Sequence, residues 1–132
     1  MFETVVTLIG TLIGEPTRRR YSTGSSTRFR LRAVERRFQP DNQTWVDGES
    51  MFVSVTCWRD LGEHVAKTLK RGDRVIVVGR LYHREYESEN QHRLSVELDA
   101  RAVGPDLNFC AGELEWIWDK PREQATLLPV AA

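Results

Sequence analysis

The stretch Met51–Trp58, which reads MFVSVTCW, alternates between two kinds of side chain and decides the fold class of this chain. Alternation with β-branched and aromatic residues predicts a β-strand. One face of this strand is apolar and would enter a core: Met51, Val53, Val55 and Cys57. The other face carries two aromatic rings, Phe52 and Trp58, separated by Ser54 and Thr56. Such a face suits the stacking of flat ligands such as nucleobases, although burial of both faces in a β-sandwich would produce the same pattern.

Four other segments have strand patterns, and one has the spacing of a helix. The predicted strands are 4–13, 27–34, 74–81 and 93–103, and the second of them can continue to Phe38. Leu61, Val65 and Leu69 recur at intervals of four residues. This spacing predicts a short amphipathic helix that ends near Gly72.

The segments between these elements have the composition of turns and loops. Residues 22–26 predict a turn, Gln39–Ser50 predicts a hairpin loop with Trp45 near its middle, and Arg84–His92 predicts a polar hairpin tip. The segment Arg18–Tyr21 is short and basic, and no strand is assigned to it.

The order of elements is therefore strand, strand, strand, helix, strand, strand. Gly10 and Gly79 lie inside the first and fourth strands, where they allow the coiling that closes a small barrel. We predict an all-β fold: a five-stranded OB-fold barrel with one short helix between strands 3 and 4, plus a C-terminal extension. This fold commonly binds oligonucleotides or oligosaccharides.

The charge distribution favours a polyanionic partner. The formal net charge is zero, but residues 1–80 carry fourteen basic and nine acidic side chains, whereas residues 81–132 carry five and ten. Eight arginines and a single acid, Glu35, fall within residues 17–40. A local basic face attracts nucleic acid whatever the total charge. Surface arginines that only keep the protein soluble would give the same charge distribution.

Composition excludes several other classes of protein. A chain of 132 residues is expected to form one domain. Because no signal peptide or apolar span of about 20 residues is present, we expect a cytoplasmic protein with no membrane contact. Cys57 and Cys110 make no disulfide framework, and the three histidines have no metal-ligand spacing. No cofactor, metal or enzymatic activity is predicted, since no nucleophile elbow, phosphate loop or paired-carboxylate motif occurs.

Two segments resemble bacterial single-stranded DNA-binding proteins. They are FVSVTCWRDLGEHVAKTLKRGDRVIVVGRL at 52–81 and VTLIGTLIGEPTRRRYSTGSSTRFRLRAVERR at 6–37. The resemblance covers residues 1–107 and implies an OB-fold domain that assembles as a homotetramer. It also implies that the protein wraps single-stranded DNA without marked sequence preference and is associated with the nucleoid.

The resemblance also implies positions for base stacking and phosphate contact. The stacking positions are Phe38, Phe52, Trp58 and Tyr86, and the family often has tryptophan at three of these. Core packing is the alternative for Phe38 and for Tyr86. Phosphate contacts are expected from arginines of the second predicted strand: Arg28, Arg30 and Arg32 alternate onto its non-core side, and Arg36 and Arg37 lie in its continuation.

The C-terminal region departs from the usual family pattern. The sequence shows no flexible linker and no acidic tip, so it resembles the shorter second paralogue of some bacteria, and no acidic-tail recruitment of repair enzymes is expected. Residues 108–132 form the predicted extension, in which 109–118 has the pattern of a strand. We expect this strand to clamp a neighbouring subunit; folding back on its own barrel is the alternative. The predicted subunit contacts are Val5, Val6, Leu8, Leu114, Trp116 and Trp118.

The predicted function is protection of single-stranded DNA during replication, recombination, repair or DNA uptake. An OB-fold module for RNA, or a primosome-type accessory protein, is the alternative. The residues do not separate DNA from RNA.

Overall fold

The computed structural model describes residues 3–118, except for the side chain of Arg36. Six strands and one helix follow along the chain: β1 (Val5–Leu12), β2 (Thr17–Tyr21), β3 (Gly24–Gln39), β4 (Thr44–Trp58), α1 (Arg59–Thr68), β5 (Arg74–Ser88) and β6 (Gln91–Pro105).

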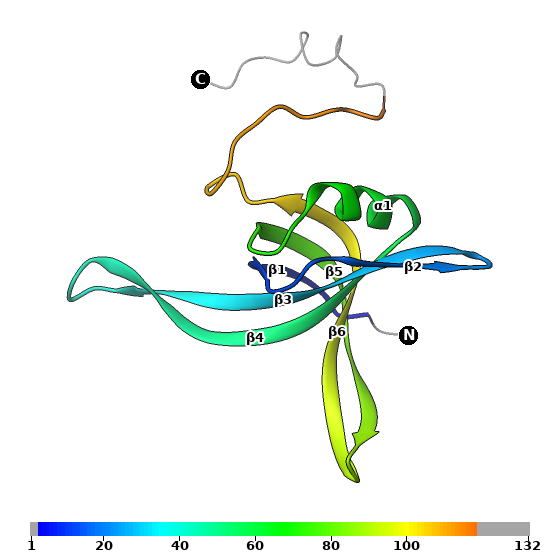
Figure 1. The fold of residues 1–132 in the computed structure, drawn as a ribbon. Coiled ribbons are helices and arrows are strands. Elements are labelled where there is room, and N and C mark those ends of the chain that lie inside the picture. Colours follow the sequence, from blue (N-terminus) through cyan, green and yellow to red (C-terminus); the bar gives the residue numbers. More distant parts are fainter. Residues whose placement is uncertain (1–2, 119–132) are drawn as a thin grey trace.

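Five of the strands close into a ring. The sheet runs β1-β5-β6-β4-β3-β2, and β1 pairs in addition with β3 through Gly10–Ala33, Thr11–Arg32 and Leu12–Leu31. All pairings are antiparallel except the one between β4 and β6. Helix α1 lies between the third and fourth strands of the ring in chain order (Figure 1). This is the arrangement of an OB-fold, so the predicted fold class is confirmed.

Glycine allows the ring to close. A Cβ atom at Gly10 would lie 2.4 Å from the backbone oxygen of Arg32, and one at Gly79 would lie 2.1 Å from that of Asp99. Any side chain at Gly10 or Gly79 would collide with the backbone of the neighbouring strand. The strands can approach this closely only because glycine has no side chain.

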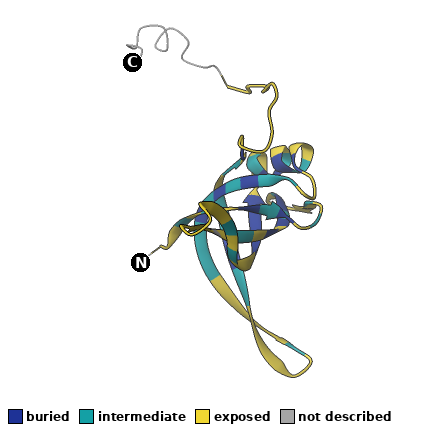
Figure 2. Cartoon of the chain, turned by 90° about the vertical axis from the view of Figure 1, so that its left-hand side faces the viewer, coloured by how far each residue is buried: buried dark blue, intermediate teal, exposed yellow. Residues whose placement is uncertain are grey.

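The core lies inside this ring and beneath α1. Its buried side chains come from every barrel strand and from the helix: Leu12, Phe29, Leu31, Val53, Val55, Cys57, Val65, Leu69, Val75, Val77 and Leu98. The Thr27 hydroxyl also donates a hydrogen bond to the Gly62 carbonyl at 2.7 Å, which ties α1 to β3. Figure 2 shows that burial is concentrated in the barrel and that the far end of the β5–β6 hairpin is exposed.

Two hairpins extend beyond the barrel as long arms, which corrects the prediction of two loops. Gln39–Ser50 is mostly strand, because β3 runs to Gln39 and β4 starts at Thr44. Arg84–His92 is also strand except for Glu89 and Asn90, whose φ angles of 54° and 63° are those of a tight hairpin turn. Two polar strands can satisfy each other's backbone hydrogen bonds without burying an apolar face. Their sequences therefore lack the alternation of apolar and polar residues that usually marks a strand.

Other boundaries also differ from the prediction. Arg18–Tyr21 belongs to β2, a sixth strand that pairs only with β3. Helix α1 ends at Thr68, because Leu69 already has extended backbone angles. Gly72, at φ 94°, lies in the following turn.

The segment after β6 forms no strand, contrary to the prediction for 109–118. Residues 110–118 have no helical or strand structure, since an extended segment needs a neighbouring ladder to become a strand. Leu114, Trp116, Ile117 and Trp118 are all more than half exposed, so this part of the extension does not fold back onto its own barrel.

Candidate nucleic-acid interface

The outer face of β3 and β4 combines cations with aromatic rings. Cross-strand partners in an antiparallel pair point to the same side, and the pairs here are Arg28–Thr56, Arg30–Ser54 and Arg32–Phe52. The alternate residues Phe29, Leu31, Val53, Val55 and Cys57 are buried in the core. Met51 was also predicted to enter the core, but it lies toward the arm and is 37% exposed. The predicted separation of an apolar inner face from an aromatic, basic outer face is therefore present.

The four predicted stacking residues are all exposed. Phe52 and Trp58 lie on β4, Phe38 lies near the end of β3, and Tyr86 lies on the β5 part of the second arm. Each has between 43% and 50% of its surface accessible, so the core-packing alternative for Phe38 and Tyr86 does not hold. Only Phe52 and Trp58 belong to the barrel wall, whereas Phe38 and Tyr86 stand on the two arms.

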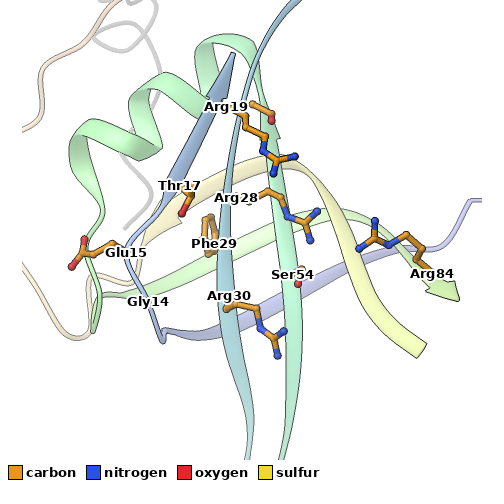
Figure 3. A pocket seen from close by; sticks show the side chains of 10 residues that line it. Gly14, Glu15, Thr17, Arg19, Arg28, Phe29, Arg30, Ser54 and Arg84 are labelled. Atoms are coloured by element: carbon orange, nitrogen blue, oxygen red, sulfur yellow. The ribbon is translucent and has the colours of Figure 1, made fainter. Parts of the chain in front are cut away.

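A basic cleft of about 440 Å³ lies on this same face. It is lined by four arginines together with Ser26, Ser54 and Glu15 among others: Arg19, Arg28, Arg30 and Arg84. Figure 3 shows Arg19, Arg28 and Arg30 in a row along the β2–β3 side, with Arg84 reaching toward them from the second arm. Cations at this density favour phosphate oxygens as ligands.

Arg19 and Arg84 were not among the predicted phosphate contacts. Arg19 belongs to the basic segment 18–21, for which the sequence predicts no strand. Arg84 lies in the predicted polar hairpin tip. If both segments were predicted as strands, alternation would indicate which of their residues share the basic face. Only the pairing of β2 with β3 and of β5 with β6 brings Arg19 and Arg84 to the cleft.

Arg28 is held by a buried carboxylate. Its Nη2 donates to Oε1 of Glu97 at 3.1 Å and to Oε2 at 3.4 Å, and Ser95 Oγ donates to Oε2 at 2.9 Å. Glu97 is 3% exposed. The guanidinium is therefore oriented toward the cleft, but part of its charge is already balanced.

The remaining predicted arginines have different surroundings. The Arg30 guanidinium lies 6.0 Å from the centre of the Phe52 ring, a cation–π contact. Arg32 is exposed, and within residues 3–118 neither it nor Arg30 forms an ion pair. Arg37 pairs with Glu35 at 3.1 Å, which raises the pKa of Arg37 above its ordinary value through a hydrogen bond and charge attraction. The backbone of Arg36 is part of β3.

The second arm separates its charges by face. Arg84, Tyr86 and their partners Ser95 and Arg93 share one side. Glu85 and Glu87 lie on the other, where His92 Nε2 is 3.4 Å from Glu85 Oε2. Tyr86 is therefore on the side that contributes Arg84 to the cleft, and the acidic side chains point away from it.

Tyr82 occupies the base of this arm. Burial raises its pKa above the ordinary value, and the carboxylates of Asp99 and Glu97 add to this effect. The Arg80 guanidinium lies 4.4 Å from the centre of its ring. Tyr82 therefore remains a neutral phenol at physiological pH, next to the basic cleft.

Trp58 has an aromatic neighbour, Tyr21, with ring centres 6.1 Å apart. The two rings and Arg59 border a hollow of about 320 Å³. Tyr21 lies on β2, so its proximity to Trp58 depends on the strand that the sequence did not predict.

Apolar side chains of β1 divide between core and surface. Val6 and Leu8 pack against the core of their own barrel. Val5 and Ile9 face outward and are 47% and 45% exposed. In the extension, the Trp116 and Trp118 rings lie 6.3 Å apart. The exposed apolar residues are thus those available for contact with another chain.

Residues 3–118 contain no group of three or more His, Cys, Asp or Glu side chains that could hold a metal ion. Burial raises the pKa of the Cys57 thiol to about 12, so this thiol is neutral and unreactive near neutral pH. Cys110 is exposed. No helix among the described residues is long and apolar enough to span a membrane.

Comparisons with curated proteins place related sequences in several bacteria. The chain is 36% identical over 115 residues to a single-stranded DNA-binding protein of Corynebacterium glutamicum, covering 86% of this chain and 51% of that protein. It is 42% identical over 114 residues to single-stranded DNA-binding protein 2 of Streptomyces coelicolor, covering 85% and 57%. The chain thus spans little more than half the length of these relatives.

Two solved structures resemble the whole barrel. The small single-stranded DNA-binding protein from Streptomyces coelicolor has a TM-score of 0.76 at 35% identity, with 82% of this chain and 98% of that chain covered. The second single-stranded DNA-binding protein (SSBb) from Mycobacterium smegmatis has a TM-score of 0.70 at 37% identity, with 87% and 100% covered. The predicted resemblance to a short second paralogue is confirmed by these matches.

The sequence profile of the single-strand binding protein family matches residues 4–106, from the start of β1 to the end of β6. Profile, relatives and barrel topology agree, and this chain belongs to the single-strand binding protein family.

Proposed function

We propose that this protein binds and wraps single-stranded DNA without marked sequence preference, by stacking bases on aromatic rings and by contacting phosphates with arginines. The observation that carries the proposal is that Phe52 and Trp58 lie half exposed on the same barrel face as a cleft lined by four arginines. Aromatic rings stack on any base, and guanidinium groups donate hydrogen bonds to any phosphate. Binding of this kind therefore requires no particular DNA sequence.

Family membership supports this function. The relatives and solved structures described above are named as single-stranded DNA-binding proteins, and the family is one of non-enzymatic DNA-binding proteins, which agrees with the prediction that the chain is not an enzyme. Binding of this kind would protect exposed strands during replication, recombination, repair or DNA uptake, and would associate the protein with the nucleoid.

A homotetramer is the proposed assembly. Exposed apolar residues occur on β1, at Val5, and in the extension, at Leu114, Trp116 and Trp118. Apolar side chains gathered in this way favour burial against another copy of the chain. In this assembly the extension acts as a clamp strand, because a neighbouring subunit supplies the ladder partner that the single chain lacks.

Titration with poly(dT) while tryptophan fluorescence is followed tests the binding proposal. Wild-type emission should be quenched, and Trp58→Phe should reduce the quenching. Trp58→Ala should weaken binding by about 1–3 kcal/mol, the usual contribution of one stacked base, and adding Phe52→Ala should weaken it further. Leu94→Ala serves as control, because Leu94 is 62% exposed on the other side of the second arm.

Wild-type affinity in the folded Trp58→Ala, Phe52→Ala double variant would refute the proposed face. Competition between dT and rU oligomers of equal length separates DNA from RNA. Tighter binding of the RNA would support the alternative function as an RNA-binding module.

A further inference from the structure

The far end of the β3–β4 arm carries an aromatic pair, Phe38 and Trp45. The two residues are cross-strand partners, and their ring centres are 5.4 Å apart. Trp45 is 60% exposed. Packing against Phe38 covers only part of the Trp45 ring. An aromatic side chain that stays this exposed on a strand indicates a surface for binding.

A β-bulge determines which way Trp45 points. The pair Val34–Ser50 is followed by Arg36–Asp47, so two residues of β4, Gly48 and Glu49, lie opposite a single residue of β3. Side chains alternate along a strand, so one extra residue moves everything beyond it to the opposite face. Trp45 is consequently on the face that carries Phe52, although the two positions are an odd number of residues apart.

The same face continues around the barrel toward Arg74. Phe52 pairs with Arg32, Arg32 with Thr11, and Thr11 with Arg74. Three steps between neighbouring strands of about 4.8 Å each give a path of roughly 14 Å along the barrel surface from Phe52 to Arg74. The proposed DNA face therefore extends across β3 and β1 to β5.

Trp45 and Arg74 border one hollow of about 700 Å³. Ile9, Val34 and Phe109 also line it, and the Arg74 guanidinium lies 4.5 Å from the centre of the Phe109 ring. Arg74 forms no ion pair within residues 3–118. The carboxylate in the lining, Asp106, is buried and accepts hydrogen bonds from Asn108.

The geometry points to a nucleotide subsite in this hollow, with a base stacked on Trp45 and a phosphate facing Arg74. An aromatic ring and a cation without an ion-pair partner among the described residues border the same hollow, and they suit the base and the phosphate of a nucleotide. A hollow of this volume is within the range of small-molecule sites. In this subsite Phe38, itself a predicted stacking residue, also supports the Trp45 ring from the neighbouring strand. This inference rests on the proposed function, since it continues the path of the same strand beyond Phe52.

Binding of dT oligomers of increasing length to four variants tests the subsite. For oligomers that reach beyond Phe52, Trp45→Ala should weaken binding roughly 5- to 150-fold, and Trp45→Phe should restore most of the affinity. Val46→Ala is the matched control, because Val46 is the neighbouring residue on the opposite face of the arm, and it should bind like wild type. Arg74→Gln should lower the slope of log affinity against log salt by about 0.7.

The outcomes separate this inference from the proposed function. If wild type binds long oligomers and Trp58→Ala weakens that binding, but Trp45→Ala behaves like Val46→Ala, the subsite is refuted and the proposed function stands. A change in sedimentation of Trp45→Ala with unchanged DNA affinity also refutes it and assigns the hollow to a second copy of the chain. Absence of any wild-type binding to dT would refute both.

Discussion

Arg28 and Arg30 lie two residues apart on β3, yet within the described chain a neighbouring carboxylate balances the charge of only one of them. Arg28 shares its charge with Glu97, a nearly fully buried carboxylate that reaches it from a strand 69 residues further along the chain. Arg30 lies over the Phe52 ring and has no carboxylate partner among the described residues. The two side chains that the sequence places in one set therefore differ: Arg28 holds a buried carboxylate, whereas the charge of Arg30 is not balanced by one within residues 3–118.

Neutralising each arginine should reveal this difference. Arg30→Ala should lower the slope of log affinity against log salt by about 0.7, the value for one phosphate contact on a single strand. Arg28→Ala should change the slope less but lower the free energy of unfolding by about 1–3 kcal/mol, because the buried Glu97 carboxylate loses its cation and, among the described residues, keeps only the hydrogen bond from Ser95. Salt titrations and urea unfolding measure the two effects.

Arg101→Ala is the control for this comparison. Arg101 is exposed on β6 and is bound to Glu3 at 2.8 Å, so its loss should leave the slope unchanged. Equal slope changes in the Arg28 and Arg30 variants would contradict the distinction between them.

Strand β1 is the element that closes the barrel, because it pairs with β5 along most of its length and with β3 at its end. Pairing with β3 begins at Gly10, which also pairs with β5, and there the backbone of Arg32 leaves no room for a side chain. Closure of the barrel pairs the backbone N–H and C=O groups that an edge strand would leave free, and it covers the core.

Gly10→Ala should therefore destabilise the protein. The added Cβ would displace backbone, which costs about 1–3 kcal/mol or more. Gly14→Ala is the matched control four residues away, since nothing lies within 4 Å of its Cβ position. Thermal unfolding followed by circular dichroism measures both, and equal melting temperatures for the two variants would refute the steric explanation.

At the scale of the whole molecule, the single chain leaves a large apolar surface uncovered. The extension contributes Leu114, Trp116, Ile117 and Trp118, each more than half exposed. Burial of two tryptophans against a neighbour would stabilise an assembly by several kcal/mol, at about 25 cal/mol per Å² of apolar surface. The proposed clamp would thus add to the contact made by β1.

Ending the chain after Cys110 should weaken the assembly and leave the barrel intact. This end point keeps Phe109 over Arg74 and the hydrogen bond from its N–H to the Asp106 carbonyl. The shortened chain should bind single-stranded DNA at high protein concentration but dissociate more readily on dilution. The full-length Trp116→Ala, Trp118→Ala variant should show the same change in sedimentation. Identical sedimentation of the shortened and full-length chains would refute the clamp.

The parts of this protein that the sequence by itself determined are those with a buried side. Alternation in Met51–Trp58 identifies the strand and the core positions Val53, Val55 and Cys57, and the intervals among Leu61, Val65 and Leu69 identify the helix. Apolar burial dominates the stability of these elements, so their periodicity is visible in the residues. The order of the elements was then sufficient for the OB-fold.

Only the tertiary structure decided the extent of the arms and the composition of the basic face. The arms are polar ladders without a buried side, so no periodicity marks them. Arg19 and Arg84 reach the cleft, and Glu97 reaches Arg28, through strand pairing between distant segments. The side to which Trp45 points depends on the bulge at Gly48 and Glu49. Register is a property of two strands together, so neither strand's sequence contains it.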